Sequence, residues 1–174
     1  NFNSQKIIAP IMRFVNMKGI IALKDGMLAI LPLTVVGSLF LIIGQLPFEG
    51  LNQAIASVFG DTWTEPFMQV YSGTFAIMGL ISCFSIGYSY AKNSGVEPLP
   101  AGVLSLSSFF ILLKSSYVPA KGEPIGDAIS KVWFGGQGII GAIIIGLVVG
   151  AIYTVFIQRH IVIKMPEQVP QAIA

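Results

Sequence analysis

The chain has 174 residues, of which 54% are hydrophobic and only 10% are charged. An average soluble domain has about 25% charged residues, so this composition excludes an ordinary soluble globular protein. The formal net charge of +2 needs no nucleic-acid partner to explain it, and the single cysteine excludes an internal disulfide and a multi-cysteine metal site.

The first 25 residues carry the pattern of an amphipathic helix. Apolar residues recur there at helical spacing: Ile7, Ile8, Ile11, Phe14 and Val15. The opposite side holds Lys6, Arg13, Asn16 and Lys18. This arrangement predicts a helix over residues 1–25 that lies in the lipid headgroup plane at the cytoplasmic face. We interpret it as an anchor for the segment that follows; docking of a partner protein is the alternative.

Four stretches without charged residues follow, and they cover residues 26–48, 66–91, 98–113 and 132–158. A helix needs about 20 apolar residues to cross a hydrocarbon core about 30 Å thick. The third stretch is the shortest, and it reaches this length only if it continues to Val118 with the Lys114 ammonium at the interface. The sequence therefore predicts an all-α, polytopic membrane protein. Its four-helix transmembrane bundle covers residues 26–160, and a cytoplasmic segment covers residues 161–174.

The basic residues predict the orientation. If the N-terminus is cytoplasmic, the inner side holds Lys6, Arg13, Lys18, Lys24, Lys92, Arg159 and Lys164. The outer side then holds only Lys114, Lys121 and Lys131. Because cytoplasmic loops carry the excess of Lys and Arg, both ends of this four-span chain are expected to face the cytoplasm.

The segments that connect the four predicted spans also contain recognisable helix and turn patterns. Residues 49–65 predict a short helix that ends in a turn at Gly60, with Trp63 at the membrane interface. The dipeptide Ser94-Gly95 after Asn93 predicts a tight inner turn. The outer connection over residues 115–131 is rich in Pro, Gly and Ser.

Small residues repeat every four positions in the second and fourth stretches. The fourth stretch has Gly138, Ala142, Gly146, Gly150 and Thr154 at this spacing. The second stretch has Gly79, Cys83, Gly87 and Ala91. Small residues on one face let two helix backbones approach closely, which drives helix association in lipid. We therefore interpret both ridges as helix-packing surfaces; a surface that slides against a moving domain is the alternative.

No candidate catalytic residue appears. The four stretches contain no Asp, Glu, Lys, Arg or His, although proton and ion relays usually need one at mid-membrane depth. His160 has no Cys or carboxylate at ligand spacing, so it is read as an interfacial histidine and no metal or cofactor is expected. Gln45, Gln69 and Gln137 lie toward the outer ends; they could contact a sugar, but we favour contact with interfacial water.

The order of segments resembles a known family. The segments are MKGIIALKDGMLAILPLTVVGSLFLIIGQLP (17–47), GYSYAKNSGVEPLPAGVLSLSSFFI (87–111) and IVIKMPEQVPQAIA (161–174). Together they resemble the beginning of the membrane-embedded IIC component of sugar phosphotransferase systems, of the lactose/cellobiose/diacetylchitobiose type. Intact members are more than twice as long. The resemblance therefore implies the N-terminal part of a ten-helix permease, ending where a fifth span would begin.

The resemblance also implies a function. Such a permease is a homodimer in the bacterial inner membrane that takes up a disaccharide: cellobiose, diacetylchitobiose or lactose. A IIB partner phosphorylates the sugar from its own cysteine, with IIA upstream. In the family the first five helices form the dimer interface, and the second half supplies a histidine and a glutamate that contact the sugar. Neither has a counterpart here, so this chain is expected to be scaffold and dimer interface, without catalytic residues or an assigned sugar-binding residue. Cys83 is not the phosphocysteine, which belongs to the IIB domain.

Two other classes of function stay open. A small four-helix exporter usually relies on an intramembrane carboxylate, and the four stretches contain none. A structural membrane subunit would need only the packing ridges and the amphipathic helix. Further spans with a histidine and a glutamate in re-entrant segments, elsewhere in the reading frame, would favour the permease.

Overall fold

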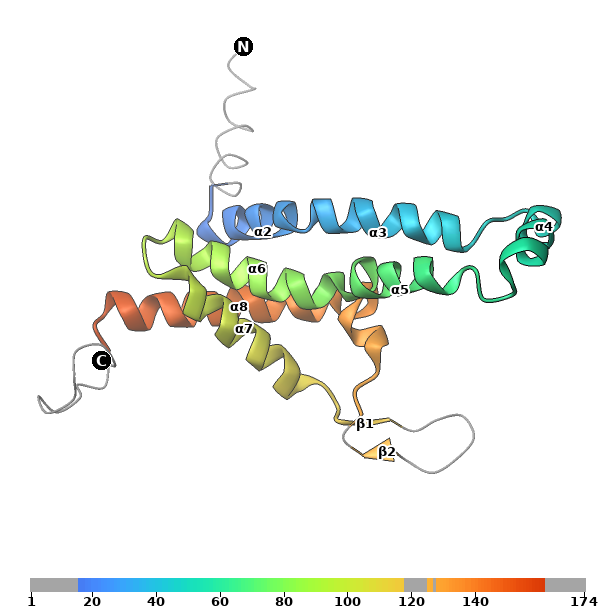
Figure 1. The fold of residues 1–174 in the computed structure, drawn as a ribbon. Coiled ribbons are helices and arrows are strands. Elements are labelled where there is room, and N and C mark those ends of the chain that lie inside the picture. Colours follow the sequence, from blue (N-terminus) through green and yellow to red (C-terminus); the bar gives the residue numbers. More distant parts are fainter. Residues whose placement is uncertain (1–15, 118–124, 127, 162–174) are drawn as a thin grey trace, which may run out of the picture.

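The computed structural model describes residues 16–117, 125–126 and 128–161. Most of the predicted amphipathic segment, residues 1–15, and most of the predicted cytoplasmic segment, residues 162–174, lie outside this range. The described part is almost wholly helical, which confirms the predicted all-α class (Figure 1). Its elements are α2 (Lys18–Ala29), α3 (Leu31–Gly44), α4 (Glu49–Phe59), α5 (Glu65–Gly73), η1 (Phe75–Ile77), α6 (Met78–Asn93), α7 (Pro98–Leu112), β1 (Ser116–Tyr117), β2 (Ile125–Gly126), η2 (Lys131–Phe134), η3 (Gly136–Gly138) and α8 (Ile139–Gln158).

Two continuous helical segments are long and apolar enough to cross a membrane. They are Glu65–Asn93, with 29 residues, and Gly136–Gln158, with 23 residues. Helices α2 and α3 qualify only when taken together, as a pair bent by 42°. Helix α7 has 15 residues and is shorter than a full span. The described residues therefore contain two candidate spans, or three with the bent pair, and the count of four remains a prediction.

The first predicted stretch differs from the structure at its start. Helix α2 begins at Lys18 and continues to Ala29, so the expected boundary between residues 25 and 26 falls inside a helix. The break comes at Ile30 instead, and Pro32 stands in the first turn of α3. Proline has no N–H to donate to the carbonyl four residues earlier, and its ring clashes with that carbonyl. The helix therefore ends and restarts here, which explains the bend.

Helix α6 forms the centre of a bundle in which α2, α7 and α8 all pack against it. Cys83 of α6, Phe109 of α7 and Ala142 of α8 form its buried apolar core. The predicted inner turn joins α6 to α7, and Gly95 adopts a φ of 74° there, which other residues rarely adopt.

Helices α3 and α5 form an arm that extends away from this bundle, with α4 at its tip (Figure 1). Gly37 lets α3 approach the chain at Thr74 and Phe75, because a Cβ at residue 37 would lie 2.6 Å from the Phe75 Cβ. The Asn52 amide donates a hydrogen bond of 2.9 Å to the Leu46 carbonyl and fixes the start of α4. Helix α4 ends at Gly60, as the sequence predicted.

Candidate functional site

The small residues of α8 lie against α6. Ala142, Gly146 and Gly150 are buried, and so is Thr154. A Cβ at residue 146 would lie 2.9 Å from the Cys83 carbonyl oxygen, which is closer than real Cβ atoms come to a backbone oxygen. A Cβ at residue 150 would lie 2.8 Å from the Cβ of Tyr90. The two backbones are therefore as close as glycine allows, which is the geometry of small-residue helix packing in membranes.

Gly138, the first residue of this ridge, has a different neighbour. It is buried in η3, and a Cβ there would overlap the carbonyl oxygen of Trp133. It permits the tight turn that leads into α8 and makes no comparable approach to α6. The sequence spacing alone could not separate this residue from the rest of the ridge.

The small residues of α6 also have partners outside α8. A Cβ at Gly79 would lie 2.7 Å from the Gly135 carbonyl oxygen, in the connection before α8. A Cβ at Gly87 would lie 3.0 Å from the Ala101 carbonyl oxygen of α7. The Cys83 thiol donates to the Ser105 carbonyl oxygen, also on α7, at 3.3 Å. The α6 ridge therefore packs on α7 and on the turn before α8, while the carbonyl oxygens of Cys83 and Gly87 also face the glycines of α8.

The contact between α2 and α6 is a further close approach, and the sequence analysis missed it. A Cβ at Gly26 would lie 2.7 Å from the Cα of Ile86. Ala22 and Gly26 of α2 and Ile30, which directly follows α2, are all buried and lie at intervals of four. That spacing was the available signal, but it crosses the predicted boundary at residue 25 and was split between two segments.

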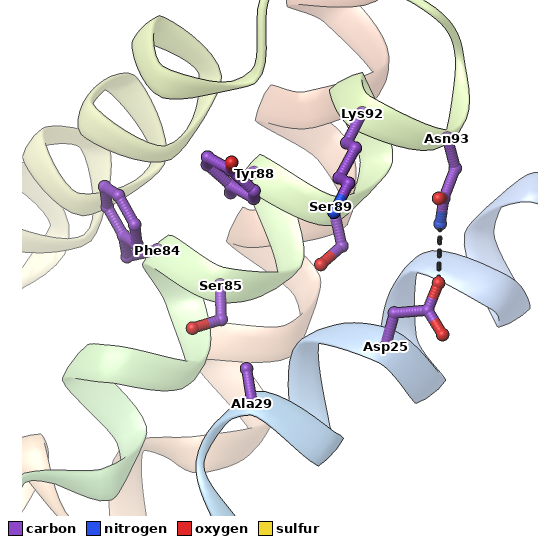
Figure 2. Close-up of a pocket in the computed structure, with 8 residues that line it drawn as sticks. All are labelled: Asp25, Ala29, Phe84, Ser85, Tyr88, Ser89, Lys92 and Asn93. Carbon is purple, nitrogen blue, oxygen red and sulfur yellow. Dashed lines mark hydrogen bonds between the residues drawn. The ribbon is translucent and has the colours of Figure 1, made fainter.

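A cavity of about 380 Å³ opens between α2 and α6 (Figure 2). It is lined by Asp25, Ala29, Phe84, Ser85, Tyr88, Ser89, Lys92 and Asn93. The Asn93 amide donates a hydrogen bond of 2.9 Å to Asp25 Oδ2, and Lys24 Nζ lies 3.3 Å from Asp25 Oδ1. The rings of Phe84 and Tyr88 stack with their centroids 6.0 Å apart.

This cavity has the chemistry of a polar binding surface. It combines a carboxylate, an amide, an ammonium group and hydroxyls with an aromatic wall, but its residues include no nucleophile paired with a base. No group of three or more metal-ligating side chains forms within the described ranges. Gln137 lines two other cavities, and neither Gln45 nor Gln69 lines them. His160 is exposed just after α8.

A comparison with models of known protein families shows to which family the chain belongs. The family model described as "Phosphotransferase system, EIIC" matches residues 24–174. The chain belongs to this family. The resemblance seen in the sequence is thereby confirmed, and the apolar helices are those of an integral membrane protein.

Individual proteins that are similar to this chain are EIIC components as well. This EIIC chain is 38% identical to the lichenan permease IIC component of Bacillus subtilis (strain 168), over 98% of this chain and 39% of that protein. It is 38% identical to the cellobiose-specific EIIC component of Geobacillus stearothermophilus, over 88% and 35%.

A solved structure is also similar. The crystal structure of the transporter ChbC, the IIC component from the N,N'-diacetylchitobiose-specific phosphotransferase system, gives a TM-score of 0.83 at 34% identity. That match covers 97% of this chain and 40% of the solved chain. The EIIC chain therefore spans about two fifths of the length of these relatives.

Proposed function

We propose that this chain belongs to the membrane component of a phosphoenolpyruvate-dependent sugar phosphotransferase system. Such a component translocates a disaccharide, here cellobiose, diacetylchitobiose or lactose, for phosphorylation by a IIB partner that IIA supplies with phosphate. The observation that carries the proposal is the family match over residues 24–174. It favours a permease over the exporter and the structural subunit that the sequence left open.

Within that permease we assign this chain the role of scaffold and homodimer interface. Three helices approach α6 at glycines, which makes the bundle a rigid platform. The polar groups that would fix a sugar need to converge in a pocket, and the cavity between α2 and α6 uses its carboxylate internally, as acceptor for Asn93. We therefore expect the sugar-contacting residues elsewhere in the permease.

We also propose that both ends of the chain are cytoplasmic, and that the end of the bundle where α6 and α8 terminate faces the cytoplasm. The Gln158 amide donates a hydrogen bond of 3.0 Å to the Ser94 carbonyl, so the end of α8 lies beside the α6–α7 turn. Lys92 and Arg159 are thereby brought to one end of the bundle. This arrangement supports the orientation that the excess of basic residues predicts.

A chimera tests the proposed function. The chain replaces the aligned first part of the cellobiose-specific EIIC component of Geobacillus stearothermophilus. It is expressed in cells that lack their own disaccharide IIC and retain the soluble phosphotransferase proteins. We expect uptake of labelled cellobiose that depends on phosphoenolpyruvate. Neither this chain alone nor the truncated relative alone should support uptake.

Two results would contradict the proposal. One is a chimera that inserts into the membrane at the level of the intact relative but shows only the uptake of empty vector. The other is uptake by this chain alone, which would place the sugar site within these helices and make Gln45, Gln69 and Gln137 the first residues to mutate.

A further inference from the structure

Helices α7 and α8 diverge toward the β1–β2 end of the molecule (Figure 1). A cavity lies between their side chains. Its volume is about 750 Å³, about twice that of the cavity between α2 and α6. The end of α7 forms one wall, and η3 with the first turns of α8 forms the other. We call this cavity the wedge.

One part of the wedge lining is apolar. Phe109 and Leu112 of α7 face Ile144 and Ile145 of α8 across it. Leu112 is 70% exposed and Ile144 is 56% exposed, so much of this wall lacks packing partners in the described chain. An unfilled apolar cavity forfeits dispersion contacts on its lining, and a lipid acyl chain would restore them.

The rim of the wedge is polar and cationic. By the rim we mean the polar residues that line the wedge: Lys114, which follows the end of α7, with Ser116, Ser130, Trp133 and Gln137. No acidic side chain is among the described residues that line the wedge. An ammonium group, an indole N–H and two hydroxyls can all donate hydrogen bonds to a phosphate group. Lysine and tryptophan are also the side chains that gather at headgroup depth in membranes.

We propose that the wedge binds one anionic phospholipid. An acyl chain lies along the apolar wall of α7 and α8, and the phosphate accepts hydrogen bonds from Lys114 and the rim. The order of groups fits this ligand, because the cationic rim stands where the apolar wall ends. The inference is independent of the sugar and concerns how this part of the permease is held in its membrane.

The charge of the rim is tested first. The purified 174-residue chain is titrated in detergent with phosphatidylglycerol or phosphatidylcholine, and bound lipid is counted by native mass spectrometry. We expect Lys114→Gln to reduce the preference for phosphatidylglycerol about fivefold, which corresponds to about 1 kcal/mol for one lysine at an anionic lipid surface. Lys114→Arg should keep the preference. Lys131→Gln is the matched control, because Lys131 is exposed nearby but lines a different cavity.

The apolar wall is tested second. A Cβ at Gly141 would meet nothing within 4 Å, so Gly141→Leu fills the wedge without displacing the backbone. We expect it to reduce binding of both lipids by severalfold. Gly73→Leu is its control, since residue 73 is equally open and does not line the wedge. Melting temperatures of all variants show that the fold is retained.

Four results would overturn the proposal. The first is an unchanged lipid preference in Lys114→Gln together with unchanged binding in Gly141→Leu. The second is an equal loss of preference in Lys131→Gln, which would indicate only general surface charge. The third is displacement of the lipid by soluble glycerol phosphate, which would identify a phosphate site without an acyl-chain groove. If a second copy of the chain fills the wedge instead, disulfide cross-linking through Ile144→Cys would proceed efficiently and lipid would not bind.

Discussion

Gly146 shows how much a single residue decides in this bundle. Its Cα faces the Cys83 carbonyl of α6, and no atom larger than hydrogen fits between them. Val148, two positions away on the same helix, is 50% exposed and faces outward. The two positions have similar neighbours in sequence but opposite surroundings in space, and this makes them a matched pair for mutation.

We predict that Gly146→Leu destabilises the chain by about 2 kcal/mol, because overpacking in a closely packed interior costs about 1–3 kcal/mol. Val148→Leu should change stability by less than about 0.5 kcal/mol, since surface substitutions have effects of this size. Thermal melting in detergent, with the monodisperse fraction from gel filtration, measures both. Equal melting temperatures for the two variants would show that α6 and α8 do not meet at residue 146.

At the scale of elements, the break between α2 and α3 separates the bundle from the arm. Pro32 stands at the start of α3, and the bend between the two helices is 42°. The helices that follow the break, up to Gly73, form the arm: α3 and α5 pack against each other, and α4 lies at the tip. The proline thus decides where one structural unit ends and the next begins.

We predict that Pro32→Ala straightens this pair, because alanine restores the backbone donor and favours a continuous helix. With 12 and 14 residues at about 1.5 Å per residue, loss of the bend lengthens the pair by about 2 Å. Spin labels on cysteines at Lys18 and Ile42, in a Cys83→Ala background, report the distance. Pro47→Ala, outside the pair, should leave it unchanged. The same distance in all three chains would rule out Pro32 as the cause.

The ridges show what a sequence can and cannot predict at this scale. Spacing of four placed Gly146 and Gly150 on one face of a helix, and both are buried. Spacing could not reveal that Gly87 faces α7, because the choice of partner depends on how three helices surround α6. The Asp25–Asn93 hydrogen bond could not be predicted from the sequence for the same reason, since 68 residues separate its partners.

At the scale of the whole molecule, helical periodicity and charge predicted an all-α membrane chain, and the segment order predicted its family. The number of spans was harder to predict from the sequence. The test for a span counts apolar residues, and it cannot anticipate a bend at Ile30 or a helix that ends at Leu112. Those endpoints depend on packing against neighbours, which is a property of the folded chain.

The orientation is testable on the same scale. Ser57 on α4 and Glu97 after the inner turn are both exposed. Single cysteines at these positions are expected to react from opposite sides of the membrane, with residue 57 outside. The native Cys83 is buried and serves as an internal negative control. Reaction of the residue 97 cysteine with an impermeant reagent in intact cells would show that the predicted topology is wrong.

The closeness of α6 and α8 also limits how this gene can vary. Every amino acid other than glycine carries a Cβ, so any missense change at codon 146 or codon 150 places an atom where the facing helix already lies. Val148 and Ile152, which are 50% and 53% exposed, can exchange with other apolar residues. One helix therefore contains two kinds of position, two residues apart. At the buried glycines no replacement is neutral, and at the exposed positions one apolar residue can replace another.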